Sequence, residues 1–355
     1  WKDLKINKVA LITGSAGFIG FHLANCLVSK DWKVIGIDAM TDYYDVGLKQ
    51  ARHKILKLNN KFFGYEGLIQ DQRLLDNIYN EHKPNIIIHL AAQPGVRYSI
   101  ENPQSYIDSN ILGSFYIFEL AKKFKPDHLL IGSTSSVYGN SDNLPFHENQ
   151  KSDMPISLYA ATKKSNEILA HSYSHLFSIP TTIFRFFTVY GPWGRPDMAL
   201  FKFTKNILSK LPIDIYNYGN MERDFTNIND LVEAINLLID VIPICPDKRK
   251  NIIPNDSLSN SAPYRIVNIG NSNSVNLLKY VEELENALKK KAIKNFIQAQ
   301  KGDLMKTSSD ITLLKNLTGF KPTIKLRDGI QEFVAWYISY YKENIKIQDF
   351  ENNLK

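Results

Sequence analysis

The chain has 355 residues, 44% of them hydrophobic, which is enough for one large α/β domain with a smaller one attached. The formal net charge is +7, but the 43 Lys and Arg residues are spread along the chain without a basic run interleaved with aromatic residues, so no nucleic-acid partner is expected. The two cysteines, and apolar runs far below the roughly 20 residues that cross a bilayer, predict a cytoplasmic protein with no disulfide framework and no membrane segment. The sequence leaves open whether a further segment precedes Trp1.

The first half of the chain alternates short apolar runs with segments of helical periodicity. The apolar runs predict strands at 9–13, 33–37, 85–91, 128–132 and 181–186. The periodic segments predict helices at 18–30, 105–123 and 158–175. Short strands joined by such helices favour a parallel sheet covered on both faces, and right-handed crossovers make it a doubly wound, Rossmann-type α/β fold.

The regular alternation ends near residue 190, where loops rich in Pro, Gly and Asn appear at 191–197 and 246–263. We therefore expect a first domain over 1–190 that carries the doubly wound sheet. A smaller mixed α/β lobe over 191–355 is expected to bind the substrate, with some segments exchanged between the two.

The first predicted strand runs into a glycine-rich turn that opens the first predicted helix. Gly14, Gly17 and Gly20 follow a GxxGxxG spacing, which departs from the GxGxxG of many dehydrogenases. Glycines here let the backbone approach a pyrophosphate, and the helix N-terminus supplies N–H donors. Asp38 ends the next strand, where a carboxylate would bind the adenosine ribose and repel a 2′-phosphate. The pattern predicts NAD rather than NADP as the cofactor.

A tyrosine and a lysine share one face of the helix predicted at 158–175. Tyr159 and Lys163 are four residues apart, so an ammonium beside the phenol is expected to lower the pKa of Tyr159 and prepare it as a general base. The hydroxyl cluster at 133–136 lies at the carboxyl end of the preceding strand, where ligands bind in open α/β sheets. One of these hydroxyls is expected to hydrogen-bond the reacting oxygen.

Four motifs occur in the order TGSAGFIG, HLAAQ, STSSVYG and YAATK, and together they resemble the extended short-chain dehydrogenases/reductases. The resemblance implies that Tyr159 is the catalytic base, that Lys163 also contacts the nicotinamide ribose, and that Thr134 is the assisting hydroxyl. The remaining residues expected to contact NAD are Phe18, Ile19, Ile69, Ala91 and Ala92.

Three longer segments resemble the UDP-glucuronate 4-epimerases within that superfamily. They are AAQPGVRYSIENP at 91–103, RFFTVYGPWGRPDMALFKF at 185–203 and SAPYRIVNIGN at 261–271. Related 4,6-dehydratases and uronate decarboxylases carry an acid directly before VYG, where this chain has Ser136, so elimination and decarboxylation are disfavoured. The resemblance implies NAD-dependent 4-epimerisation of UDP-glucuronate to UDP-galacturonate through a transient 4-keto sugar.

That intermediate would be a β-keto acid, which loses carbon dioxide when its carboxylate bond aligns with the carbonyl π system. A clamp must therefore hold the carboxylate away from that geometry. By resemblance, the hydroxyls of Thr134, Ser135, Ser136 and Thr188 form the clamp, and Arg195 reaches the carboxylate or closes over the substrate. At the other end of the substrate, the resemblance assigns the diphosphate to Arg223 and the uridine ribose to Asp303. No metal site is predicted.

One departure and several alternatives remain at the level of sequence. Relatives show Gly-Asp-Ile where this chain has Gly67, Leu68 and Ile69; Leu68 cannot accept a hydrogen bond from adenine, so NAD binding is expected to be weaker by about 1 kcal/mol.

A 4-epimerase of UDP-glucose or of a UDP-N-acetylhexosamine would share the chemistry, and a non-catalytic NAD-binding regulatory protein would share the fold. The helices predicted at 105–123 and 158–175 resemble those that form a four-helix interface in relatives, which implies a homodimer.

Overall fold

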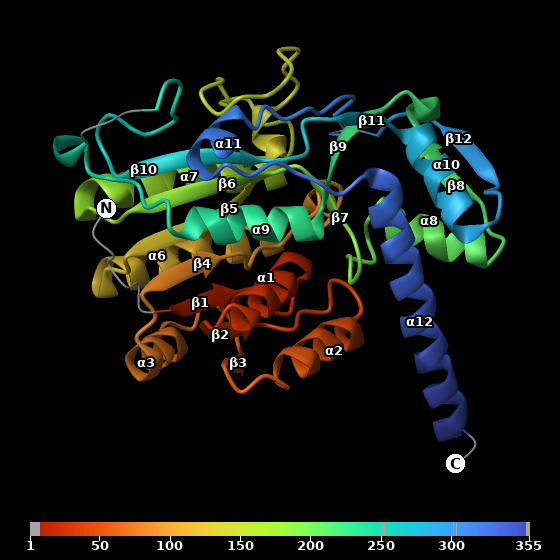
Figure 1. The fold of residues 1–355 in the computed structure, drawn as a ribbon, viewed down its shortest axis with the longest axis horizontal. Coiled ribbons are helices and arrows are strands. Elements are labelled where there is room, and N and C mark those ends of the chain that lie inside the picture. Colours follow the sequence, from red (N-terminus) through yellow and green to blue (C-terminus); the bar gives the residue numbers. More distant parts are fainter. Residues whose placement is uncertain (1–7, 250–252, 301, 303, 353–355) are drawn as a thin grey trace.

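The computed structural model describes residues 8–249, 253–300, 302 and 304–352, with 343–352 described by backbone alone. Its centre is a sheet of seven parallel strands in the order β10-β6-β5-β4-β1-β2-β3 (Figure 1). The strands are β1 (Val9–Thr13), β2 (Lys33–Asp38), β3 (Phe62–Glu66), β4 (Ile86–His89), β5 (His128–Thr134), β6 (Thr181–Phe186) and β10 (Tyr264–Ile269). The strand order reverses between β1 and β4, which opens a crevice at the carboxyl ends of the strands. The predicted doubly wound parallel sheet is confirmed.

Helices cover both faces of this sheet. One face carries α1 (Phe18–Ser29), α9 (Ile228–Ile239) and α11 (Thr312–Thr318), and the other carries α3 (Gln72–His82), α6 (Gly113–Phe124) and α7 (Leu158–Phe177). Alternate residues of β1 point to opposite faces, so Ala10 and Ile12 pack under α1 and α9 while Leu11 packs under α6 and α7. Both faces of the sheet are therefore buried, which explains why its strands read as continuous apolar runs.

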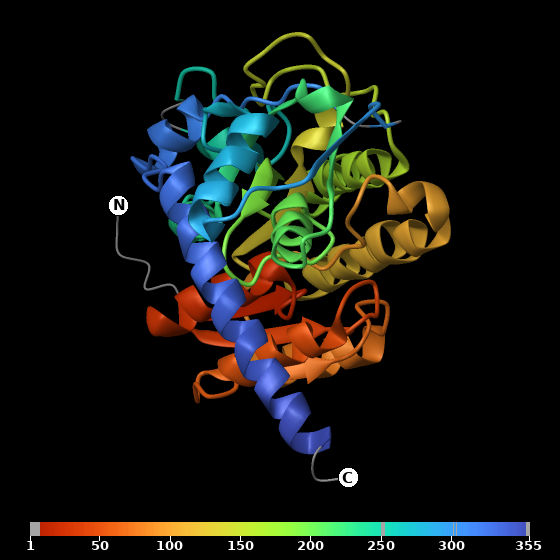
Figure 2. The same ribbon diagram turned by 90° about the vertical axis from the view of Figure 1, so that its right-hand side faces the viewer.

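A smaller lobe is built from two short sheets. One has the order β11-β9-β7 and the other pairs β12 with β8. The lobe contains β7 (Thr188–Tyr190), α8 (Ala199–Leu208), β8 (Ile213–Tyr216), β9 (Glu222–Asn227), β11 (Ser274–Asn276), α10 (Leu277–Leu288), β12 (Lys294–Ile297) and α12 (Leu326–Asn352). Helix α12 runs down the side of the molecule and projects past the rest of the fold at its C-terminal end (Figures 1 and 2).

Segments after residue 190 return to the central sheet. β10 pairs with β6 in register from Tyr264↔Thr181 to Ile269↔Phe186, and α9 packs on α1 in the same hydrophobic core. The proposed division at residue 190 therefore describes two lobes that share chain segments, and it stays a prediction. Within the described residues, no helix is long and apolar enough to span a membrane.

Two local predictions differ from the structure, and one segment had no prediction. The helix expected at 105–123 is interrupted: α5 (Pro103–Tyr106) leads into a π-helical segment, η1 (Ile107–Leu112), before α6 begins. The π-helix turns Asn110 inward, where it binds the main chain of Gln93 and the Thr162 hydroxyl on α7. β4 ends at His89, so Ala91 and Ala92 lie in the loop after the strand rather than closing it. The sequence also left 39–84 unassigned, where α2 (Val46–Leu56), β3 and α3 form.

Candidate active site

The glycine-rich turn after β1 has the shape that a dinucleotide requires. Gly14 has φ +74°, and a Cβ atom there would lie 2.8 Å from the backbone nitrogen of Ala91. A Cβ atom on Gly20 would collide with the carbonyl of Gly14, so only glycine lets α1 pack this closely on the turn. Gly17 caps α1 without any side-chain hydrogen bond, which leaves the first N–H groups of the helix for an anion.

Asp38 at the end of β2 adjoins this turn. Its carboxylate accepts hydrogen bonds from the backbone N–H of Ala16 at 3.0 Å and of Met40 at 2.9 Å. These bonds hold the carboxylate beside the turn, with lone pairs left for ribose hydroxyls. The turn, the free helix N-terminus and the carboxylate together fit the pyrophosphate and adenosine of NAD.

The other residues predicted to contact NAD are mostly buried. Phe18 is buried in the first turn of α1, and Ile19 packs partly against the core under that helix. Ile69 is buried, and its side chain lies so close to Gly113 that a Cβ atom there would collide with it. Leu68 is 54% exposed and offers no polar atom at its side chain.

Tyr159 lies in the first turn of α7, beside the end of β5. Ser157 caps this helix by accepting a hydrogen bond from Ala160 N–H at 3.1 Å, which fixes where the helix starts. The Thr134 hydroxyl, on the last residue of β5, is near enough to the Tyr159 phenol to lower its pKa. Its ring also contacts Tyr106 edge to face, with centroids 6.1 Å apart. The structure thus brings the predicted base and the predicted assisting hydroxyl together.

Burial and the charge of Arg195 dominate the electrostatics around Tyr159. Burial raises the pKa of Tyr159, while the charge of Arg195 and the nearby Thr134 hydroxyl lower it. The cation with a resolved effect on the phenol is thus Arg195, whereas the influence predicted for the Lys163 ammonium stays a prediction. Lys163 is itself 3% exposed, and burial lowers its pKa to about 8.

A buried ion pair beneath the site was missed by sequence reasoning. Glu167, one turn after Lys163 on α7, accepts hydrogen bonds from Arg185 Nε at 2.9 Å and Nη2 at 2.7 Å, and from the Ser133 hydroxyl at 2.7 Å. Arg185 and Glu167 are 1% and 2% exposed, and their attraction keeps the pKa of the Glu167 carboxyl low despite burial. The pair joins α7 to β6 directly under the hydroxyl cluster. An acid eight residues after the catalytic tyrosine and an arginine within an apolar strand were the available signals.

A chain of neutral polar groups supports the loop after β4. The Thr13 hydroxyl accepts the backbone N–H groups of Leu90 and Ala91, and it contacts His89 Nδ1 at 2.7 Å. His89 Nε2 continues to the Ser114 hydroxyl at 3.0 Å, and burial lowers the pKa of His89 to about 3. The imidazole is therefore neutral, so it orients the loop that passes the cofactor turn without adding charge to the site.

The predicted carboxylate-binding hydroxyls lie along one edge of the two sheets. Ser135 and Ser136 open a 3-10 turn, η2 (Ser135–Tyr138), directly after β5. The Thr134 hydroxyl accepts the Ser136 N–H and donates to the Ser136 hydroxyl, both at 3.2 Å. Thr134 pairs across the sheet with Phe186, two residues before Thr188 at the start of β7. The four hydroxyls therefore come from neighbouring strand ends.

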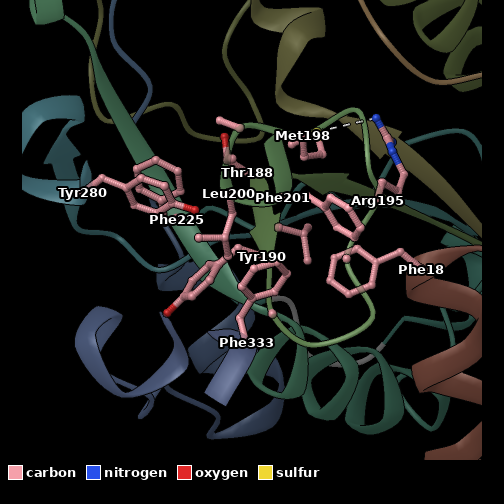
Figure 3. A pocket seen from close by; sticks show the side chains of 14 residues that line it. Phe18, Thr188, Tyr190, Arg195, Met198, Leu200, Phe201, Phe225, Tyr280 and Phe333 are labelled. Atoms are coloured by element: carbon pink, nitrogen blue, oxygen red, sulfur yellow. Dashed lines mark hydrogen bonds between the residues drawn. The ribbon is translucent and has the colours of Figure 1, made fainter. Parts of the chain in front are cut away.

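The loop at 191–197 brings Arg195 to the rim of a pocket that Thr188 also lines from another side (Figure 3). Arg195 makes a two-point ion pair with Asp197, with Nε–Oδ1 at 2.9 Å and Nη2–Oδ2 at 2.7 Å, and its Nη2 also contacts Met198 Sδ. Tyr43 donates a hydrogen bond to the same carboxylate at 3.2 Å. Figure 3 shows the guanidinium pointing away from the aromatic wall of Tyr190 and Phe333. Arg195 is near the reacting tyrosine, but Asp197 already occupies one edge of the Arg195 guanidinium.

The region expected to hold UDP is only partly described. Arg223 lies on β9, and its Nη1 donates to the carbonyls of Glu222 at 3.0 Å and Met305 at 3.1 Å. Asp303 lies outside the described residues. A separate opening nearby is lined by Arg97, Ile100, Glu101, Tyr216 and Gln300, and the Arg97 guanidinium lies 4.1 Å from the centre of the Tyr216 ring.

The acid next to Arg223 has a structural task. Asp224 is fully buried and accepts the backbone N–H groups of Asn271 at 2.7 Å, Ser272 at 3.1 Å and Ser309 at 2.9 Å. It thereby ties β9 to two loops of the smaller lobe and fixes the strand that carries Arg223.

Comparisons with known proteins agree over almost the whole chain. The family model described as GDP-mannose 4,6 dehydratase matches residues 11–333. A probable UDP-glucuronate 4-epimerase of Rhizobium meliloti (strain 1021) is 50% identical over 337 residues, covering 94% of this chain and 97% of that protein. UDP-glucuronate 4-epimerase 1 of Arabidopsis thaliana is 42% identical over 341 residues, covering 95% of this chain and 78% of that protein.

A solved structure extends the similarity to three dimensions. The UDP-glucuronic acid 4-epimerase from Bacillus cereus, in complex with UDP-glucuronic acid and NAD, superposes with a TM-score of 0.83 at 32% identity, covering 94% of this chain and 100% of that one. The chain therefore belongs to the GDP-mannose 4,6-dehydratase family and, within it, to the UDP-glucuronate 4-epimerases.

Proposed function

We propose that this protein is an NAD-dependent enzyme that inverts C4 of UDP-glucuronate to give UDP-galacturonate. The observation that carries the proposal is the placement of Tyr159 beside Thr134, with the charge of Arg195 acting on its phenol. A base, a proton-sharing hydroxyl and a cation meet there, while Ser136 stands where an eliminating or decarboxylating enzyme would carry an acid.

The chain's own groups divide the work of the reaction. When bound, NAD⁺ supplies a reversible hydride acceptor at C4 of the sugar. Gly14, Gly17 and the N-terminus of α1 hold its pyrophosphate, Asp38 holds its adenosine ribose, and Lys163 its nicotinamide ribose. Tyr159 takes the proton of the C4 hydroxyl on its phenolic oxygen and later returns it, and the Thr134 hydroxyl assists by hydrogen-bonding the C4 oxygen when each proton transfer takes place.

The hydroxyls of Thr134, Ser135, Ser136 and Thr188 hold the C6 carboxylate of the sugar. Neutral donors suit this task because they bind the carboxylate while the ring turns to present its other face. Arg195 adds a positive charge at the rim of the pocket that attracts the carboxylate, and its ion pair with Asp197 limits the strength of that attraction. The clamp keeps the β-keto acid from aligning for loss of carbon dioxide.

The nucleotide end lies in the smaller lobe. We assign the diphosphate to Arg223 and the uridine ribose to Asp303, and we assign the uracil base to the opening lined by Arg97 and Tyr216. The Tyr216 ring can stack on a planar base, and the Arg97 guanidinium beside it can donate hydrogen bonds to that base. The proposed domain roles follow: 1–190 binds NAD and 191–355 binds the UDP-sugar, with β10 returned to the first sheet.

We further propose that the enzyme is a homodimer in a reducing compartment such as the cytoplasm. Large apolar side chains are exposed along η1, α6 and α7, namely Ile107, Leu112, Phe115, Ile168 and Leu176. Their burial against a second copy would remove apolar surface from water. Both cysteines are free thiols, as a reducing compartment allows. Light scattering of the wild type and of a Phe115→Asp, Ile168→Asp variant tests the dimer: only the wild type should have twice the chain mass.

The substrate is tested by incubating the protein with NAD⁺ and, separately, UDP-glucuronate or UDP-glucose, followed by analysis of the sugars released on hydrolysis. We expect galacturonate from the first and little galactose from the second. Equal turnover of UDP-glucose would contradict the proposed specificity. Tyr159→Phe should abolish turnover while NAD binding remains, and an active Tyr159→Phe variant would refute the assigned base.

A further inference from the structure

A fully buried arginine connects the dinucleotide turn to the loop that carries Arg195. Arg52 on α2 donates from Nη1 to the Ala16 carbonyl and the Tyr44 hydroxyl, both at 2.8 Å. From Nη2 it donates to the carbonyls of Trp193 at 2.6 Å and Gly194 at 3.4 Å. Across the described part of the chain, no carboxylate lies within ion-pair distance of this guanidinium.

Such a residue is costly to keep for packing alone. A buried cation without a carboxylate partner loses its hydration and is compensated only by neutral acceptors. An apolar side chain of similar size would fill the same space at no such cost. Only a planar group with several donors can bind carbonyls from two separate loops at once.

Each loop that Arg52 joins is itself closely held. Ala16 lies between Gly14 and Gly17, its N–H donates to Asp38, and its carbonyl accepts from Arg52, so both sides of this residue are fixed. The turn that receives the NAD pyrophosphate therefore cannot shift without moving Arg52.

The loop at 191–197 is tied from the same side. His22 on α1 donates from Nε2 to the Pro192 carbonyl at 2.9 Å. Trp193, which follows, has a left-handed φ of 59° and packs on Trp336 and Tyr340 of α12, with ring centroids 5.2 and 5.0 Å away. The position of Arg195, two residues further on, is thus set by a loop anchored on the dinucleotide turn.

We propose that Arg52 is a positioning residue that couples the two ligands: NAD seated on the glycine turn holds the Ala16–Arg52–Trp193 connection in place and so presents Arg195 to the uronate. NAD and UDP-glucuronate then bind cooperatively, and Arg52 carries that cooperativity. The choice of UDP-glucuronate as the probe rests on the proposed function.

The test measures binding rather than turnover. In a Tyr159→Phe background, which holds both ligands without reaction, the Kd of UDP-glucuronate is measured by calorimetry with and without saturating NAD⁺. We expect NAD⁺ to lower this Kd by about 10-fold, within the usual range for coupled sites. Adding Arg52→Lys, which keeps the charge but cannot reach both loops, should reduce the effect of NAD⁺ to under about 2-fold. UDP, which has no sugar to reach Arg195, should bind equally in both proteins.

A matched control separates positioning from general damage. Arg265, at the amino end of β10 and 7% exposed, pairs with Asp256 at 2.9 and 3.0 Å. Arg265→Lys should lower stability yet keep the full effect of NAD⁺. If Arg52→Lys does not fold, His22→Leu, which cannot donate to the Pro192 carbonyl, loosens the same loop and should weaken the effect in part. An unchanged NAD⁺ effect in the Arg52→Lys or His22→Leu protein, or none in the parent, overturns the coupling. A parent that binds UDP but not UDP-glucuronate refutes the proposed substrate instead.

Discussion

The charge of Arg195 should set the pH at which this enzyme begins to work. Burial raises the pKa of Tyr159, and Arg195 is the strongest influence that opposes it. Arg195→Gln removes that stabilisation of the phenolate, so the Tyr159 pKa should rise. Below that pKa the active fraction falls about 10-fold for each pH unit, so the variant should be slower than the wild type at any such pH. The rising limb of kcat/KM against pH, measured with UDP-glucuronate at saturating NAD⁺, should move to higher pH.

Asp197→Asn provides the opposite perturbation at the same ion pair. The Asp197 carboxylate receives two hydrogen bonds from Arg195 and one from Tyr43, so it partly neutralises the guanidinium. Without that carboxylate the field of Arg195 at Tyr159 is stronger, and the limb should move to lower pH. General damage to the loop would move both variants in the same direction. Limbs that shift together, or that do not shift at all, would refute the electrostatic role of Arg195.

Three further predictions concern the clamp and the buried acids. Thr188→Val should raise the KM for UDP-glucuronate about 10-fold, since a hydrogen bond to a charged group contributes about 1.5–3 kcal/mol. The variant should also release carbon dioxide and form some UDP-pentose, which chromatography detects; slower turnover without carbon dioxide release would contradict the clamp. Burial raises the pKa of Glu148 to about 7, so between about pH 4.5 and 7 the folded state holds a proton that the unfolded chain releases, and the stability of the wild type falls across this range. Glu148→Gln should therefore stabilise the protein by up to about 3 kcal/mol at pH 8 but not at pH 4.5. Denaturant midpoints of the variant and the wild type that are equal at both pH values would contradict this. Glu167→Gln should lower the free energy of unfolding by about 3–5 kcal/mol, because it leaves Arg185 buried and unpaired. Replacing both Glu167 and Arg185 by Met should restore most of the lost free energy. A Glu167→Gln protein as stable as the double Met variant would contradict this.

The sequence was informative wherever chemistry depends on local spacing. Gly14 and Gly20 occupy positions where a Cβ atom would meet backbone, so their identity alone indicated the turn. Tyr159 follows its helix cap within one turn of α7, and Thr134 ends a strand, so periodicity and strand ends placed both. Such residues act through backbone geometry that a short segment specifies by itself.

Contacts between distant segments could not be predicted in the same way. Arg52 is 141 residues from Trp193, and nothing in the helical segment that carries it indicates which carbonyls its donors reach. Arg195 was expected to reach the carboxylate or to close over the substrate, but its neighbour Asp197 and the distant Tyr43 decide how much of its charge is available. The π-helical turn at Asn110 likewise arises because its side chain binds Gln93 and Thr162, partners that become neighbours only in the folded sheet.

The fate of the hydrogen on C4 tests the central claim most directly. UDP-glucuronate carrying deuterium at C4 is incubated with the protein and NAD⁺ in ordinary water, and the UDP-galacturonate is analysed by mass spectrometry and NMR. Hydride transfer to bound NAD⁺ and back, with Tyr159 moving only the hydroxyl proton, predicts that the product keeps its deuterium at C4. Product that has exchanged this deuterium for solvent hydrogen, or no galacturonate at all, would contradict the account.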